Sequence, residues 1–202
     1  MRLYYAPGAC SLAPHIVLRE VGANFTLTRV NTATHRVEDG ADYYTIAPKG
    51  QVPVLELDDG TRISEGPVVC QFIADQAGDT ALLPAYGSLA RLRVLEWCNY
   101  LTSEIHKSFT PIFHRHVDTA AIDALKTILQ RKLAWVDTQL QGRAHLTGEP
   151  FTIADAYLYV LATWAPPVEL DLSGLEHLHA FQRRVAERPA VRAARRAEGL
   201  PA

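Results

Sequence analysis

The pattern of apolar residues in this 202-residue chain changes once, near residue 80, and this change most restricts the folds open to it. Before that point short strand-like runs alternate with helical ones, and after it helical periodicity continues. A chain whose strands are confined to one part folds as an α/β part followed by an all-helical part. We therefore predict a first domain over residues 1–78, a linker over 79–88 and an all-helical domain over 89–202.

The first part follows the order strand, helix, strand, then an irregular segment, two strands and a helix. Apolar residues recur every fourth position over 11–21, and Asp58-Asp59-Gly60 marks a tight turn between two strand-like runs. The predicted elements are strands over 2–5, 26–31, 52–57 and 61–63 and helices over 11–21 and 65–77. After the linker we expect helices over 89–117, 120–141, 152–165, 175–187 and 189–198.

Charge and apolar content exclude several classes of protein. With 20 basic and 22 acidic residues the formal net charge is −2, unlike the basic proteins that bind nucleic acid. The chain is 48% hydrophobic, which is enough to build a core, and no apolar run approaches the ~20 residues of a membrane-spanning helix. No export signal is visible after Met1. We expect a cytoplasmic protein that binds neither nucleic acid nor membrane.

Cys10, Cys70 and Cys98 are too few and too widely spaced for a disulfide framework. Cys10 lies between the first predicted strand and the first predicted helix, where its sulfur faces unpaired helix N–H groups. Those groups favour the thiolate, so we predict a lowered pKa for the Cys10 thiol. The alternative is that Cys10 is only a small buried residue without a chemical role. Ala13 stands where a Cys-x-x-Cys dithiol needs its second thiol, so redox chemistry at Cys10 requires an outside thiol.

Two further motifs mark a strand start and a helix start. Val52-Pro53 opens a strand, where an X-Pro bond can be cis, although an ordinary trans proline at a sheet edge also explains it. Ser64-Glu65-Gly66-Pro67 opens a helix, and simple capping by the hydroxyl explains this pattern. A helix start of this kind also binds a carboxylate, while Glu65 can hold an ammonium group. A ligand whose end carries both an ammonium and a carboxylate group, as an amino acid does, would suit Glu65 and the helix start.

Together these motifs resemble the glutathione transferase family, and more closely its bacterial beta class. The resemblance covers essentially the whole chain and is carried by residues 4–12, 50–53, 64–66, 99–107, 151–158 and 188–191. It implies an α/β thioredoxin-like N-terminal domain plus an all-α C-terminal domain, the glutathione transferase fold. It also implies a homodimer that uses glutathione as co-substrate.

The resemblance assigns the binding of glutathione to the first domain. In this family the backbone of the residue before a cis-proline pairs with the cysteinyl part of glutathione as an added strand, which implies this role for Val52 and Pro53. Glu65 and Gly66 are expected to hold the γ-glutamyl end, with Gln51 beside them.

Two positions concern the other parts of glutathione. Cys10 is expected to face the glutathione sulfur. The family often places a lysine for the glycine carboxylate where this chain has His35, and an imidazole makes a weaker or pH-dependent contact. Arg36 is the alternative donor, and the sequence leaves the choice open.

In the helical domain Asn99, Ser103 and His106 are spaced by four and three residues and so share one helix face with Thr110 and Phe113. Taken alone, such a polar stripe indicates a solvated face. The resemblance instead implies positions around the glutathione thiol and across a two-fold interface for Asn99, Ser103, Glu104, His106 and Lys107. Among these, His106 is expected to assist the thiolate.

Three further patterns complete the helical domain. Trp164 and Phe113 are expected to line the pocket of the second substrate, and a core tryptophan is the alternative reading of Trp164. Thr152-Ile153-Ala154-Asp155 is a capping box. The histidine pairs His114/His116 and His177/His179 are two residues apart and diverge on a helix, so we expect no metal site.

The resulting hypothesis is a glutathione transferase that conjugates the glutathione thiol to small hydrophobic electrophiles, with Cys10 and His106 as catalytic residues. One alternative is glutathione-dependent thiol–disulfide exchange or reductive dehalogenation through a Cys10 mixed disulfide. Another is a non-catalytic binding protein with the same fold. The sequence does not identify the natural electrophile, because the shape of an apolar pocket decides that specificity.

Overall fold

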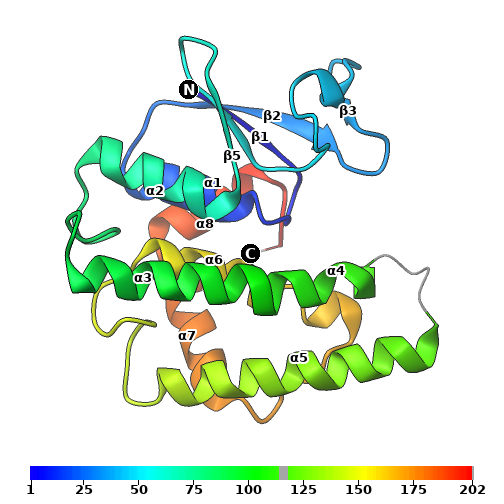
Figure 1. Cartoon of the computed structure of the whole chain (residues 1–202), viewed down its shortest axis with the longest axis vertical. Coiled ribbons are helices and arrows are strands. Elements are labelled where there is room, and N and C mark those ends of the chain that lie inside the picture. The colour runs from blue at the N-terminus through cyan, green and yellow to red at the C-terminus, as the bar shows by residue number, and fades with distance from the viewer. Residues whose placement is uncertain (114–117, 202) are drawn as a thin grey trace. The chain divides into compact units, whose positions relative to one another are not determined.

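The computed structural model of the chain describes residues 1–113 and 118–201 (Figure 1). The chain divides into two compact units, one formed by Met1–Leu83 with Glu187–Ala202 and the other by Pro84–Ala186. No helix in the described residues is long and apolar enough to cross a bilayer.

A five-stranded sheet with the order β3-β2-β1-β4-β5 forms the centre of the first unit. Its strands are β1 (Arg2–Tyr5), β2 (Thr26–Asn31), β3 (Arg36–Val37), β4 (Val54–Glu56) and β5 (Arg62–Ser64). β1 and β2 are parallel, which requires a crossover, and the other neighbouring strands are antiparallel. The predicted βαβ opening and the following hairpin are therefore confirmed, and β3 is an edge strand that the sequence pattern did not indicate.

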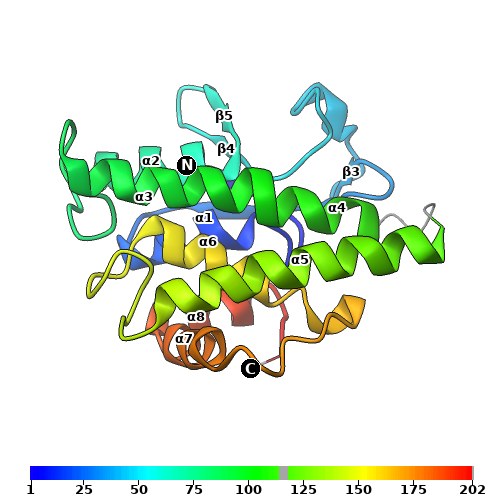
Figure 2. The ribbon, with the colours of Figure 1, turned by 60° about the horizontal axis from the view of Figure 1, so that its bottom comes forward.

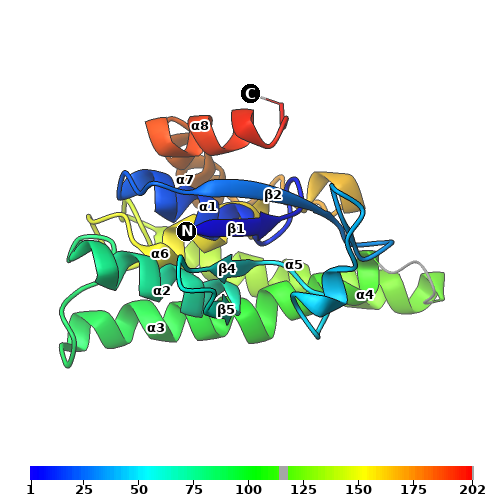
Figure 3. The ribbon, with the colours of Figure 1, turned by 90° about the horizontal axis from the view of Figure 1, so that it is seen from above.

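Three helices belong to the same unit: α1 (Leu12–Glu20), α2 (Gly66–Ala77) and α8 (Pro189–Ala197). α1 packs against both α2 and α8, as the view from above shows (Figure 3). Because α1 has neighbours on two sides, every residue from Leu12 to Leu18 is buried. The turn that precedes α1 is thus attached to a rigid core helix.

The placement of α8 differs from the domain division that the sequence suggests. The helical pattern groups residues 189–198 with the all-helical part, whereas in the structure they belong to the unit of the sheet. Val191 and Ala194 of α8 are buried, and the helix packs against α1. Periodicity predicts that a helix forms, but it does not say which core will bury the apolar face.

The regular elements described in the second unit are all helical. They are α3 (Leu89–Tyr100), the π-helix η2 (Leu101–His106), α4 (Lys107–Phe113), α5 (Thr119–Leu140), α6 (Ile153–Ala162), the short 3₁₀ helix η3 (Pro166–Val168) and α7 (Glu176–Ala186). α5 runs beside α4 (Figure 2). α6 contacts α3, η2 and α7, and all ten of its residues are buried. α6 is therefore the central helix of this unit.

The predicted capping box at the start of α6 is confirmed. The backbone N–H of Thr152 donates to Oδ2 of Asp155 at 2.8 Å, and the Thr152 hydroxyl donates to the same oxygen at 2.7 Å. Oδ1 of Asp155 accepts from the backbone N–H of Leu146 at 2.8 Å. One buried carboxylate thus ties the start of α6 to the segment before it.

The single helix predicted over 89–117 is interrupted, and residues 114–117 lie outside the described part of the chain. The π-helix η2 separates α3 from α4 and contains Ser103, Glu104 and His106. The Thr102 hydroxyl donates to the Cys98 carbonyl at 2.8 Å, and the Ser108 hydroxyl donates to the Glu104 carbonyl at 2.6 Å. A hydroxyl that bonds to the carbonyl four residues earlier competes with an α-helical hydrogen bond. This competition explains why a π-helix replaces the α-helix here.

Candidate functional site

Cys10 lies in the turn between β1 and α1, as predicted. Its thiol donates a hydrogen bond to the Val52 carbonyl, with an Sγ–O distance of 3.2 Å, and the Val52-Pro53 peptide bond is cis. Ser11, the next residue, is fully buried, and its hydroxyl bonds to both the N–H and the carbonyl of Ala6 at 3.2 Å. The hydroxyl of Ser11 therefore holds the turn closed.

The state of the Cys10 thiol differs from the sequence expectation. Burial of the sulfur raises its pKa to about 12, while hydrogen bonds from the backbone N–H groups of Cys10 and Ser11 lower it by less. The predicted N–H groups are present, but loss of solvation disfavours the thiolate more strongly than they favour it. Cys10 is therefore a neutral thiol at neutral pH.

A buried carboxylate anchors the turn that carries Cys10. Glu198 accepts a hydrogen bond from the backbone N–H of Gly8 at 2.9 Å and lies 2.8 Å from Nδ1 of His15, with both side chains fully buried. Nε of Arg19 donates to Nε2 of His15 at 2.9 Å. Sequence reasoning missed Glu198, because nothing in the sequence links a residue after the last helix to the first turn.

The start of α2 is more unusual than the capping explanation suggests. Glu65, rather than Ser64, is the residue before the helix, and its φ is 70° in a residue that is not glycine. No side chain caps α2. The Glu65 carboxylate pairs with the Lys49 ammonium at 2.5 Å, and both side chains are more than half exposed. The simple capping interpretation is therefore wrong, and Lys49 is a residue of this region that the sequence analysis overlooked.

His35 is held beside the segment that leads to Val52. Its Nδ1 lies 3.1 Å from the Gly50 carbonyl oxygen, and its ring packs on Tyr44 with centroids 4.5 Å apart. Gly50 has a φ of 67°, and a Cβ there would lie 2.7 to 2.9 Å from the rings of Tyr44 and His35, so only glycine fits. Arg36, the alternative donor, bonds instead to the Gly40 carbonyl at 3.3 Å.

The backbone around Gln51 is also fixed. The Tyr43 hydroxyl donates to the Gln51 carbonyl at 3.0 Å, and Tyr43 is fully buried in the core of the sheet. The first unit therefore brings Cys10, Val52 and Pro53 together, with Gln51 adjacent in the chain. Glu65 and Gly66 stand at the start of α2.

In the second unit His106 contacts two aromatic residues. Its Nδ1 lies 2.6 Å from the Tyr157 hydroxyl, and its ring packs edge-on against Trp164 with centroids 4.9 Å apart. Trp164 also makes edge contacts with Phe109 and Phe113. The structure thus brings together three of the residues predicted for this domain, His106, Phe113 and Trp164, and adds Tyr157 and Phe109.

The other polar residues predicted on this face have different surroundings. Glu104 pairs with Lys132 at 2.8 Å, which lowers the pKa of the carboxyl, and a hydrogen bond with Ser103 lowers it further. The side chains of Asn99, Ser103 and Lys107 are exposed. The predicted stripe assumes α-helical spacing, and the π-helix η2 replaces that spacing over Leu101–His106.

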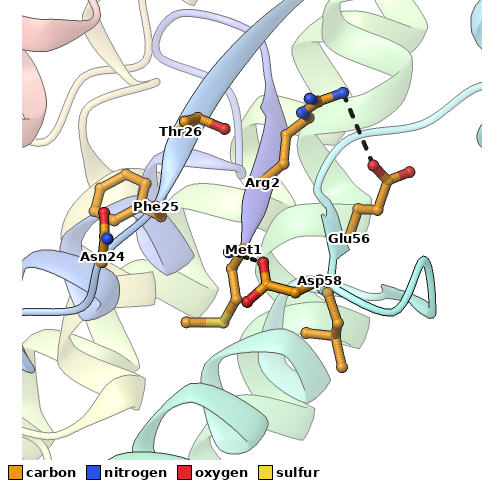
Figure 4. A pocket seen from close by; sticks show the side chains of 8 residues that line it. Met1, Arg2, Asn24, Phe25, Thr26, Glu56 and Asp58 are labelled. Carbon is orange, nitrogen blue, oxygen red and sulfur yellow. Dashed lines mark hydrogen bonds and ion pairs between the residues drawn. The ribbon is translucent and has the colours of Figure 1, made fainter.

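A pocket of about 480 Å³ lies elsewhere in the first unit (Figure 4). It is lined by Met1, Arg2, residues 24–26 and residues 56–58. Ion pairs of Met1 with Asp58 (2.7 Å) and of Arg2 with Glu56 (3.8 Å) engage its charged groups. None of the residues predicted to bind glutathione lines this pocket.

The described residues contain no group of three or more His, Cys, Asp and Glu that could hold a metal ion. His179 bonds through Nε2 to the Leu172 carbonyl at 2.9 Å. The pair His114/His116 lies outside the described residues.

Comparison with known proteins covers both units. The family described as "Glutathione S-transferase, N-terminal domain" matches residues 8–76, and "Glutathione S-transferase, C-terminal domain" matches residues 100–189. Glutathione S-transferase GstA of Escherichia coli O157:H7 is 47% identical over 200 residues, which cover 99% of this chain and 100% of the relative.

Two solved structures are similar over their full length. A sphingomonad glutathione S-transferase complexed with glutathione has a TM-score of 0.95 and 44% identity, with 100% of both chains covered. A beta-class glutathione S-transferase of Sphingomonas chungbukensis has a TM-score of 0.96 and 43% identity, again with 100% of both chains covered. The chain therefore belongs to the glutathione S-transferase family, and within it to the bacterial beta class.

Proposed function

We propose that this enzyme conjugates the thiol of glutathione to small hydrophobic electrophiles. The glutathione thiol first releases its proton to solvent. The thiolate then attacks an electrophilic carbon, a thioether forms, and the leaving group departs with the electrons of its bond. Full-length relatives that are named glutathione S-transferases support this proposal, as does the sphingomonad structure complexed with glutathione.

The observation that carries the proposal is the start of α2. The Glu65 carboxylate already holds one ammonium group, that of Lys49, and no side chain caps the helix. The γ-glutamyl end of glutathione would bring an ammonium group for Glu65 and a carboxylate for the N–H groups that begin at Gly66. An exposed ion pair contributes only ~0–1 kcal/mol, so Lys49 can be displaced at low cost.

The cysteinyl part would pair with the backbone of Val52, next to Pro53, as an added strand. The Val52 carbonyl accepts from the Cys10 thiol, so a backbone N–H of glutathione would replace this donor. The thiol of Cys10 would then be available to donate to the glutathione sulfur. Gln51 would flank the bound peptide, and His35 would meet its glycine carboxylate.

The second unit would complete the chemistry. A neutral imidazole N–H at His106 would stabilise the glutathione thiolate without a net charge of its own. Phe113 and Trp164 would hold the hydrophobic electrophile, supported by their packing against Phe109. Further polar contacts to glutathione, within one subunit or across a dimer interface, would come from Asn99, Ser103, Glu104 and Lys107.

Thiol–disulfide exchange through Cys10 is the weaker candidate. It requires the Cys10 thiolate as nucleophile, and burial raises the pKa of this thiol to about 12. Conjugation needs no Cys10 thiolate, because the attacking sulfur belongs to glutathione. Measured turnover distinguishes both of these enzymes from a protein that binds glutathione without catalysis.

The test compares two substrates with one pair of proteins. Wild type and Cys10→Ala are assayed with glutathione plus 1-chloro-2,4-dinitrobenzene, and with glutathione plus bis(2-hydroxyethyl) disulfide. We expect wild type to conjugate the aromatic electrophile and Cys10→Ala to retain part of this activity. Any disulfide exchange should disappear in Cys10→Ala. No conjugation by wild type, together with retention on immobilised glutathione, would favour the binding protein.

We also infer that the enzyme is a cytoplasmic homodimer. Leu89 and Leu92 of α3 are 65% and 56% exposed, and Tyr86 before this helix is exposed as well. Exposed apolar side chains at the start of one helix are typical of an interface between subunits.

A further inference from the structure

We propose that Tyr157 is a positioning residue for His106: its hydroxyl donates to Nδ1 and holds the imidazole in the tautomer that carries its proton on Nε2. This inference rests on the proposed role of His106 in stabilising the glutathione thiolate. Tyr157 itself touches neither glutathione nor the electrophile in this scheme and acts only through the imidazole.

The geometry of the pair is that of a strong hydrogen bond. The Tyr157 oxygen lies 2.6 Å from Nδ1 of His106, and the ring centroids are 5.9 Å apart at an interplanar angle of 71°. Trp164 packs edge-on against the imidazole at 4.9 Å and 74°. A hydrogen bond at one end and an aromatic edge on the ring together define its orientation.

Tyr157 and His106 lie on helices that differ in how regularly they are hydrogen-bonded and how deeply they are buried. Tyr157 is 3% exposed and lies in α6, whose residues are all buried and whose start is tied by the Asp155 carboxylate. His106 is the last residue of the π-helix η2, where the regular α-helical hydrogen bonding is interrupted. A ring on such a segment gains most from a fixed hydrogen-bond partner, and α6 supplies one.

The chemistry of a neutral imidazole explains why this partner matters. One ring nitrogen carries a proton and the other carries a lone pair, and the hydrogen bond made by one nitrogen sets the state of the other. When the Tyr157 hydroxyl donates to Nδ1, Nε2 must carry the proton and can donate to a thiolate. In the opposite tautomer Nε2 would present a lone pair to the thiolate and repel it.

The test uses two tyrosines of the same helix. Tyr157→Phe removes the hydroxyl and keeps the ring, and Tyr159→Phe makes the same change at an equally buried position of α6. We expect Tyr157→Phe to lower kcat for conjugation about tenfold with KM for glutathione within twofold, because Tyr157 does not contact glutathione in this scheme. Tyr159→Phe should retain kcat within twofold.

A double variant distinguishes action through His106 from a separate effect. If Tyr157 acts through the imidazole, adding Tyr157→Phe to His106→Ala should cause no further loss of kcat. Losses that multiply in the double variant would overturn the proposal, and so would equal kcat values for Tyr157→Phe and Tyr159→Phe.

An NMR measurement of the His106 ring tests the proposed tautomer without an activity assay. ¹⁵N shifts of the labelled His106 ring in the wild-type protein should show a protonated Nε2 and an unprotonated Nδ1, and Tyr157→Phe should shift the ring toward a mixture of tautomers. A protonated Nδ1 in neutral wild type would overturn the proposal even if Tyr157→Phe failed to fold. If instead His106→Ala conjugated at the wild-type rate, the proposed role of His106 would fail, whereas the ring measurement would still report on Tyr157.

Discussion

At the scale of single residues, Glu65 combines an unfavourable backbone conformation with a side chain that is proposed to hold the ammonium group of glutathione. Its φ of 70° is costly for a residue with a Cβ, of the order of 1 kcal/mol, and its carboxylate makes an exposed ion pair with Lys49. Neither feature stabilises the fold much. Such an arrangement is typical of a position kept for binding.

Glu65→Gly should therefore separate binding from stability. Loss of a charge-assisted hydrogen bond to the glutathione ammonium, about 1.5–3 kcal/mol, weakens glutathione binding tenfold or more. The free energy of unfolding should stay level or rise by up to ~1 kcal/mol, because glycine accepts a positive φ. Calorimetric titration and urea unfolding measure the two quantities. Lys49→Ala is the control, since it leaves the carboxylate in place, and an unchanged affinity in Glu65→Gly would remove Glu65 from the site.

His35 should limit the affinity for glutathione. The Gly50 carbonyl can only accept, so Nδ1 of His35 must donate to it, and the other ring nitrogen is a single contact for the glycine carboxylate. A lysine ammonium offers three donors and a full charge to this carboxylate, so His35→Lys should bind glutathione more tightly than the wild type.

Calorimetry with S-methylglutathione measures this affinity, because the analogue binds without reacting. His35→Gln is the uncharged control and should bind no more tightly than the wild type. Equal affinities of His35→Lys and His35→Gln would contradict the assignment of His35 to the carboxylate.

The reactivity of Cys10 should follow its raised pKa. Cys70 and Cys98 are buried, so Cys10 is the half-buried thiol that alkylating reagents and oxidised glutathione should label first. Because the pKa is about 12, the thiolate fraction and hence the rate should rise roughly tenfold per pH unit from pH 7 to pH 10. Mass spectrometry after timed alkylation measures site and rate. A rate that levels off by pH 8 would show the lowered pKa of an activated thiol, and labelling of Cys70 or Cys98 first would contradict the order.

At the scale of elements, α6 organises the helical unit through its first turn. Asp155 is fully buried, and its carboxylate accepts from the backbone N–H groups of Thr152 and Leu146 and from the Thr152 hydroxyl. α6 also carries Tyr157, so the same helix links the stability of the unit to the orientation of His106.

Asp155→Ala should lower the free energy of unfolding by roughly 2–4 kcal/mol, because two buried N–H groups lose their acceptor. Asp118→Ala is the matched control: Asp118 begins α5 and accepts from the Ala120 N–H at 2.9 Å, but it is exposed. Water replaces that acceptor, so the control should lose about 1 kcal/mol or less. Equal losses in urea unfolding of the two variants would contradict the buried role of Asp155.

At the scale of the whole molecule, the last segment of the chain returns to the first. α8 packs on α1, and Glu198 bonds to the turn that carries Cys10. The arrangement couples the site in the first unit to residues far away in the sequence. The proposed assembly into a dimer also belongs to this scale.

Replacing Leu92 with aspartate should convert the proposed dimer to a monomer, since an uncompensated charge would be placed in an apolar interface. Light scattering at micromolar concentration measures the mass. Ile128→Asp is the control, because this residue is also an exposed apolar residue, 38% exposed, but lies on α5. A monomer mass for the wild-type protein would contradict the dimer.

Local pattern alone determines most elements of this fold. Strands β1 and β2 match the predicted bounds. The hairpin occurs at its predicted turn, α2 occurs where an apolar stripe at helical spacing predicts it, and α6 begins at its predicted capping box. Alternation, 3.6-residue periodicity and caps are local physical signals, and they are readable from a single sequence. The motifs around Cys10, Val52 and Glu65 are also local, which is why the amino-acid sequence by itself supports the family resemblance.

Tertiary structure alone decides the rest, because it depends on contacts between residues distant in sequence. Burial raises the pKa of Cys10 although its helix position predicts the opposite. Lys49 meets Glu65 across 16 positions, Tyr157 meets His106 across 51 and Glu198 meets Gly8 across 190. Periodicity carries no information on such pairs, since each is set only when the chain folds and water is excluded.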